Sequence, residues 1–129
     1  MTFWKHPIIL ISIGGALGAN ARYWLGYWIK KLGLGGSFPW GTFLANVSGS
    51  LLLALLTVVI LKRMPAERKW LYLMLGTGFC GAYTTFSTFK LETWTLIEKG
   101  RWAVALLNVL GSVLAGFFAV VIAMKLLKR

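Results

Sequence analysis

Four long apolar stretches, separated by short charged segments, dominate the chain. Three of them run without a charge for 30, 20 and 23 residues, at 32–61, 70–89 and 102–124. The remaining stretch, near the N-terminus, is of similar length and carries one cation, Arg22. A helix needs roughly 20 apolar residues to cross a hydrocarbon core. The pattern predicts a single transmembrane domain, 1–129, with four spans at about 6–29, 39–61, 70–94 and 102–124.

The spans are expected to be helices. Backbone groups in lipid must find hydrogen-bond partners within their own segment or in a closed barrel. Barrel strands would alternate apolar and polar residues over stretches of about 10 residues, and the sequence lacks this alternation. We therefore predict an all-α membrane protein. Tryptophans near the span ends fit an interfacial aromatic belt, at Trp4, Trp28, Trp40, Trp70, Trp94 and Trp102.

Composition and charge agree with the membrane class. Of the 129 residues, 58% are hydrophobic and 13% charged, and the formal net charge is +11. The basic residues stand between the apolar runs, so we do not expect a nucleic-acid partner. Eight Lys and Arg fall on the side of the termini and five on the other, a bias too weak to decide the orientation. A signal peptide ending near Ala21 is the alternative for the first stretch, but three glycines interrupt its apolar run.

Acidic residues are absent from the middle of every span. Glu67 lies in a loop, and Glu92 and Glu98 fall at the end of the third span. A proton-coupled antiporter or cation carrier normally needs an intramembrane carboxylate. A small multidrug-type four-helix antiporter, the alternative function, would carry it in the first span, where the polar residues are Asn20 and Arg22. The remaining amides, hydroxyls and guanidinium suit an anion or a neutral solute better than a cation.

The third span is unusual because three glycines and then several hydroxyl residues cross its middle, at 76–88. This composition favours a broken helix. Breaks at membrane depth occur where the released carbonyls are buried in protein or coordinate an ion. Carbonyls around Gly81 and Thr84 could hold a hard cation such as Na⁺. The alternative is a packing kink softened by glycine.

Other polar and aromatic residues each allow two interpretations. Asn46 either bonds between helices or contributes a donor to a pathway. Arg22 either reaches the interface as a structural cation or acts in function. Phe86 and Phe89 lie three residues apart, so they share a helix face. Their rings either pack in the ordinary way or present positively polarised edges to an anion.

Three sequence blocks are similar to those of a known family, the Fluc (CrcB) fluoride channels. The blocks are GGALGANARY at 14–23, GTFLANVSG at 41–49 and GFCGAYTTFSTF at 78–89. They occur in the family's order in a four-span chain of the right length, and the third block is the most specific. The resemblance implies a passive, multi-pass fluoride channel of the bacterial inner membrane. Such a channel exports fluoride and lowers its toxicity.

The resemblance also implies an assembly and a site. The partner would be a second copy in an antiparallel, dual-topology homodimer within lipid, with no further protein. A central structural Na⁺ would bind the backbone carbonyls of Gly81 and Thr84, and Arg22 would lie at the vestibule. The fluoride pathway would be lined by Asn46, Phe86, Phe89, Ser87, Thr88 and Ser112.

One position departs from the family. Members often have a tyrosine four residues before the serine that matches Ser112, and this chain has Asn108. An amide at this position keeps a donor, but its reach and its hydrogen-bond partner near Ser112 differ from those of a tyrosine. A third hypothesis, a non-transporting subunit of a larger complex, predicts polar residues confined to one helix face. The only histidine is His6, and we expect no enzyme because no nucleophile, base and metal occur together.

Overall fold

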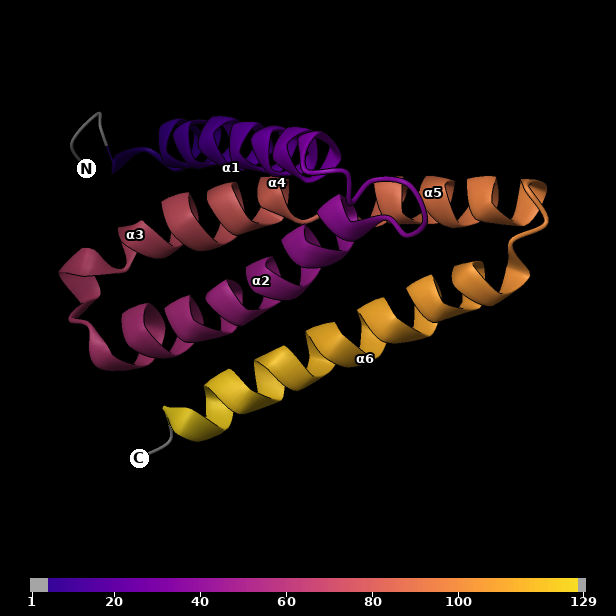
Figure 1. The fold of residues 1–129 in the computed structure, drawn as a ribbon. Helices are drawn as coiled ribbons and strands as arrows, with labels where there is room; N and C mark the ends of the chain where they lie inside the picture. Colours follow the sequence, from indigo (N-terminus) through magenta and orange to yellow (C-terminus); the bar gives the residue numbers. More distant parts are fainter. Residues whose placement is uncertain (1–4, 128–129) are drawn as a thin grey trace.

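The computed structural model describes residues 5–127, and these form an all-helical chain (Figure 1). Trp4 of the predicted aromatic belt and the basic residues Lys128 and Arg129 lie outside the described residues. Segments η2 and η4 are π-helical and η3 is a 3₁₀ turn. The elements are α1 (Pro7–Lys31), α2 (Trp40–Leu56), η2 (Thr57–Arg63), η3 (Ala66–Arg68), α3 (Trp70–Tyr72), η4 (Leu73–Cys80), α4 (Gly81–Tyr83), α5 (Phe86–Glu98) and α6 (Trp102–Leu126).

Three of these helices are long and apolar enough to cross a membrane: Pro7–Lys31, Trp40–Arg63 and Trp102–Leu126. Their bounds lie within a few residues of the predicted spans. The helix after the first loop continues two residues further than predicted, because η2 extends α2 to Arg63. The remaining predicted span corresponds to α3, η4, α4 and α5 taken together, and two non-helical residues divide it.

Small residues let α1 lie directly against the backbone of η4. A Cβ atom at Gly14 would collide with the carbonyl of Met74, and one at Gly18 would collide with the carbonyl of Phe79. Gly78 also approaches α1 closely, because a Cβ there would lie 2.8 Å from the Ile11 carbonyl oxygen. The GxxxG pattern in the first span is therefore a packing face, as expected of small residues in membrane helices.

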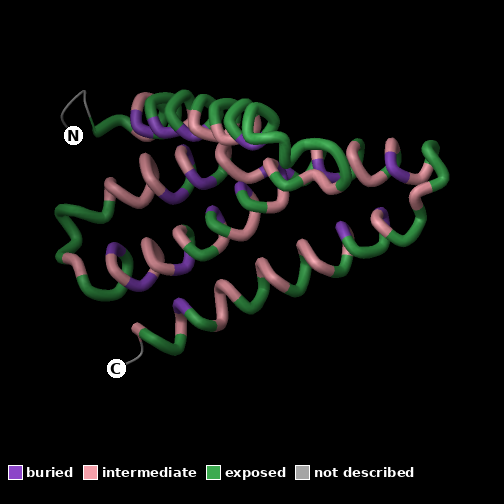
Figure 2. Tube along the Cα trace, in the orientation of Figure 1, coloured by how far each residue is buried: buried purple, intermediate pink, exposed green. Residues whose placement is uncertain are grey.

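Exposed positions occur along every long helix (Figure 2), and many of them are large apolar side chains. Helix α6 packs against α2 and α5 and leaves a long apolar face exposed, formed by Leu106, Leu107, Leu110, Val113, Leu114, Phe117, Phe118 and Ile122. Exposed apolar patches of this extent mark membrane or protein contact surfaces. Such a surface is expected of a chain whose outer faces meet lipid or a second copy.

Candidate functional site

The third helical segment is interrupted at Thr84 and Thr85. Both residues have extended backbone angles, with φ −82° and ψ 156° at Thr84 and φ −151° and ψ 124° at Thr85. Helix α5 then starts at Phe86 with Thr85 as its N-cap, because the Thr85 hydroxyl accepts a 3.2 Å bond from the Thr88 N–H. A hydroxyl at this position supplies an acceptor to a helix N–H that otherwise has none.

Asn46 of α2 stabilises the interruption from outside the segment. Its Nδ2 donates to the Thr85 carbonyl at 3.0 Å, and its Oδ1 accepts from the Thr85 N–H at 2.7 Å. One side-chain amide therefore satisfies both backbone groups of an extended residue. The amide nitrogen carries two protons, and the bond to Thr85 uses one of them.

Because of these bonds, the backbone carbonyls of Gly81 and Thr84 lose the N–H donors that they would have in a continuous helix. The Thr85 N–H would bond the Gly81 carbonyl but donates to Asn46. The Thr88 N–H would bond the Thr84 carbonyl but donates to the Thr85 hydroxyl. Gly81 and Thr84 are the two residues that the sequence predicted as cation ligands. Carbonyl oxygens are the ligands that hard cations prefer, so the donor chemistry of these residues fits Na⁺.

Close packing of α2 one turn beyond Asn46 also holds the interruption. A Cβ atom at Gly49 would collide with Thr84 Cγ2 and would lie 3.0 Å from the Tyr83 ring. The Tyr83 hydroxyl shares a 3.0 Å hydrogen bond with the hydroxyl of Ser48. Helix α2 therefore fixes both Tyr83, which precedes the extended pair, and Thr84, its first member.

The two phenylalanines predicted for the pathway stack on each other just after the interruption. Their ring centroids are 6.0 Å apart with an interplanar angle of 23°. Phe89 is buried, whereas Phe86 is 68% exposed and has the Lys90 ammonium 4.4 Å from its ring centroid. Phe86 is therefore open to a partner surface or to solvent, and Phe89 belongs to the core.

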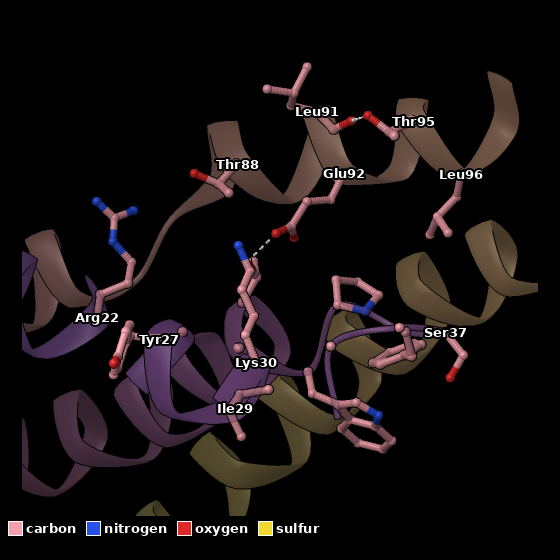
Figure 3. A pocket seen from close by; sticks show the side chains of 18 of the residues that line it. Arg22, Tyr27, Ile29, Lys30, Ser37, Thr88, Leu91, Glu92, Thr95 and Leu96 are labelled. Atoms are coloured by element: carbon pink, nitrogen blue, oxygen red, sulfur yellow. Dashed lines mark hydrogen bonds between the residues drawn. The ribbon is translucent and has the colours of Figure 1, made fainter. Parts of the chain in front are cut away.

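Two cavities lie beside the interruption, and Arg22 of α1 lines both. The smaller one, about 580 Å³, brings Arg22 together with Gly81, Thr84, Phe86 and Ser87. The larger one, about 690 Å³, contains four basic residues, Arg22, Lys30, Lys99 and Arg101. The predicted residue Thr88 lines this cavity too, and it faces the same space as Arg22 in Figure 3. Asn46, Phe89 and Ser112 are not among the lining residues of either cavity.

One acidic residue, Glu92, faces the larger cavity from α5 (Figure 3). Its Oε1 accepts a 2.9 Å bond from the Thr42 hydroxyl of α2, and its Oε2 is buried without a hydrogen-bond partner among the described residues. The sequence pattern placed Glu92 at the end of a span and predicted no role for it. Its position follows from the packing of α5 on α2, and the i, i+4 spacing of Thr42 and Asn46 indicated only that these two residues share a face of α2.

Ser112 lies on α6 and is bound into a different contact. Its hydroxyl is 3.4 Å from Asn108 Oδ1, and Asn108 Nδ2 donates to the Thr93 hydroxyl of α5 at 3.0 Å. Thr85, Thr93 and Glu92 are the polar residues of this region that sequence reasoning missed. The signal for Thr85 was its residue type, because threonine directly before a helix is a preferred N-cap residue.

The fold and this site define a class of protein. The described helices, the apolar surface and the polar interruption are those of a multi-pass helical membrane protein. Residues 9–124 match the family described as "CrcB-like protein, Camphor Resistance (CrcB)", and the chain belongs to this family.

Many curated relatives are similar over most of the chain, and three bacterial ones share the name "Fluoride-specific ion channel FluC". The protein of Oceanobacillus iheyensis is 43% identical over 84% of this chain and 81% of its own length. That of Acidobacterium capsulatum is 44% identical over 85% of this chain and 86% of its own. That of Nitrobacter winogradskyi is 40% identical over 94% of both. These relatives are ion channels by name, and the prediction that the chain is not an enzyme is confirmed.

Proposed function

We propose that this protein is a passive, fluoride-selective channel that releases fluoride from the cytoplasm and lowers its toxicity. Membership of a family whose curated relatives are named fluoride-specific ion channels supports the ion. The observation that carries the proposal is the Asn46–Thr85 pair beside the two stacked phenylalanines. It supplies amide and hydroxyl donors and aromatic rings where a continuous apolar helix would supply none.

The basic cavity would collect the anion. Four cationic side chains and one carboxylate, that of Glu92, line it, and a low-dielectric cleft with an excess of positive charge raises the local concentration of anions. Arg22 lines this cavity and the one at the interruption, so it is the vestibule residue that connects the two. An anion drawn to Arg22 from the larger cavity would then be next to the cavity at the interruption.

Beyond the vestibule, the ion would be held by weak donors. Asn46 would offer its second amide proton, Ser87 and Thr88 their hydroxyls, Ser112 a hydroxyl on α6, and the rings of Phe86 and Phe89 their positively polarised edges. Conduction requires sites that replace water but do not hold the ion tightly. Several neutral donors in a row meet that requirement better than one fixed cation at the narrowest point would.

A structural Na⁺ would bind the backbone carbonyls of Gly81 and Thr84, whose helical N–H donors bond elsewhere. In a dimer the backbone oxygens of Gly81 and Thr84 would come from both copies and surround the ion, which would hold the interrupted segments together. Among the described residues no three His, Cys, Asp or Glu side chains are close enough to form a metal site, so carbonyl oxygens are the ligands that this proposal requires.

The channel would be an antiparallel homodimer of this four-span domain. Phe86 and Leu91 on α5 are 68% and 66% exposed in the single chain, and the long face of α6 is apolar. A second copy against these faces would bring pathway residues of the two chains together. The weak bias of basic residues between the two sides is compatible with insertion in both orientations.

The test is release of fluoride from liposomes that contain the purified protein, with valinomycin to balance the charge. We expect fast fluoride release and negligible chloride release. The Asn46→Ala variant should be at least about tenfold slower, because it leaves two backbone groups of Thr85 unsatisfied. Asn20→Ala is the matched control, since Asn20 is exposed and its amide bonds only the Ala16 carbonyl of its own helix.

Several results would contradict the proposal. A folded protein that releases no fluoride, or that releases chloride equally fast, is not a fluoride-selective channel. Fluoride-independent movement of an organic cation driven by a proton gradient would favour the antiporter instead.

A further inference from the structure

A buried amide joins α6 to α5. Asn108 is only 1% exposed and is one of the two largest fully buried side chains among the described residues. It lies within a helix composed almost entirely of apolar residues. Burying an amide is costly unless it is hydrogen-bonded. The contacts of Asn108 therefore explain how this residue is tolerated there.

Asn108 is the middle member of a hydrogen-bond series that ends on the backbone of a pathway residue. The Thr93 hydroxyl donates to the Phe89 carbonyl at 2.8 Å. Asn108 Nδ2 donates to that hydroxyl at 3.0 Å, and the Ser112 hydroxyl donates to Asn108 Oδ1 at 3.4 Å. The series runs from α6 to the first turn of α5.

The direction of every bond in the series is determined. A carbonyl can only accept, so the Thr93 hydroxyl must give its proton to Phe89. Thr93 can then only accept from Asn108, which must turn its NH₂ group toward α5 and its oxygen toward Ser112. The Ser112 hydroxyl is thereby oriented by Asn108. At 3.4 Å this last bond is the longest of the three, and it is the one that a passing anion could displace.

Helix α5 depends on such side-chain contacts for its position. The extended residues Thr84 and Thr85 separate it from the hydrogen-bond ladder of α4, so the preceding helix does not fix its rotation. Two adjacent residues supply polar links instead. Glu92 accepts from Thr42 of α2, and Thr93 accepts from Asn108 of α6. Losing either link would let the stacked phenylalanine pair turn or shift.

We propose that Asn108 is a positioning residue for anion selectivity, holding Phe89 through Thr93 and orienting the Ser112 hydroxyl. The proposal rests on the proposed fluoride channel function. The distance between the phenylalanine rings of α5 and the Ser112 hydroxyl of α6 then depends on the buried amide of Asn108. A narrow anion pathway discriminates by size and by donor position, so a small shift of α5 should relax selectivity before it stops transport.

The test compares fluoride and chloride release for two variants that cut the series at different points. Asn108→Leu replaces the amide with an apolar side chain of similar size, and Thr93→Val removes only the hydroxyl. Each should lower the ratio of fluoride to chloride release about tenfold, the fold-change expected if the energy of one buried hydrogen bond appeared fully in the ion preference. Combining them should add little, because both remove the same link. Thr93→Ser, which keeps a hydroxyl, should restore the ratio.

A matched control separates positioning from general stability. Thr57→Val removes an interhelical hydroxyl contact of the same kind, the 3.2 Å bond between Thr57 and the Tyr72 hydroxyl, far from α5 in sequence. It should lower thermal stability to a similar degree as Thr93→Val and leave the ion ratio unchanged.

The outcomes distinguish this inference from the function it rests on. If the unmodified protein releases fluoride selectively but Thr93→Val and Asn108→Leu keep the same ratio, the positioning role is wrong and the channel stands. The role is also wrong if Thr57→Val changes the ratio as much as Thr93→Val does. If the unmodified protein releases no fluoride, the proposed function itself fails.

Discussion

Helix α6 and the segment from α3 to α5 are comparable in length and differ in how their backbones are satisfied. Helix α6 is an unbroken run of 25 residues, and its own ladder pairs its N–H and C=O groups. The other segment is π-helical in η4 and then extended at Thr84 and Thr85. Its missing bonds are replaced by the side chains of Asn46 and Thr85. The difference shows that polar side chains in this protein lie where backbone N–H and C=O groups lack partners within their own helix.

The two regions also use small residues differently. Gly14 and Gly18 of α1 admit the backbone of η4 at very short range, whereas a Cβ atom on Gly111 of α6 would meet only Phe43 Cε2, at 4.0 Å. The interrupted segment is thus clamped between close neighbours, and α6 packs more loosely. We expect substitutions near the interruption to have larger effects than similar substitutions on α6.

Two variants near the interruption share the largest expected effect, and the first is Gly18→Ala. Its new methyl group would meet the Phe79 carbonyl, a backbone atom that cannot rotate away, so α1 must separate from η4. We expect the free energy of unfolding to fall by about 3 kcal/mol, the upper end of the usual cost of overpacking. Denaturation of the detergent-solubilised protein would measure this. Gly26→Ala is the control, because its methyl group would meet nothing within 4 Å; equal losses for both variants would contradict the close-packing argument.

The next prediction is that alanine substitutions of Phe89 and Phe86 differ in their effect on stability. Phe89→Ala removes a buried ring and should cost about 3 kcal/mol of stability. Phe86→Ala removes an exposed ring and should change the stability of the single chain by no more than about 0.5 kcal/mol. Both should slow fluoride release from liposomes. A Phe86 variant that transports normally would remove this residue from the proposed pathway.

A smaller effect is expected at the N-cap of α5. Thr85→Ala deletes the acceptor of the Thr88 N–H and should lower the free energy of unfolding by about 1 kcal/mol. Thr85→Ser keeps a hydroxyl and should recover most of this loss. The same denaturation measurement decides it, and an alanine variant as stable as the serine variant would show that the cap contributes nothing.

The smallest effect is expected on α6 and has the opposite sign. Gly111→Ala adds a methyl group in open space and should raise stability by about 0.5 kcal/mol, because alanine loses less conformational freedom than glycine in a helix. Fluoride release should not change. A destabilised Gly111→Ala protein would mean that α6 is packed as tightly as α1, and the contrast between the two regions would be lost.

The sequence by itself determined the helical class, the presence of three long apolar helices and the unusual composition of the third span. These features depend on local composition, because lipid penalises charges and unpaired backbone groups residue by residue. The three sequence blocks also predicted the family of the chain. Asn46, Phe86 and Phe89 lie within these blocks. The roles of these residues and of the Na⁺ ligands stay predictions.

Only the tertiary structure decided how the interruption is held and what surrounds it. Asn46 and Thr85 are 39 residues apart, and Thr42 and Glu92 are 50 apart. Asn108 and Thr93 meet only because α5 and α6 pack together. No local pattern specifies such pairs, because the packing of whole helices determines which side chains face each other. Sequence reasoning therefore identified where the polar groups lie along the chain, and the fold determined which of them bond to each other.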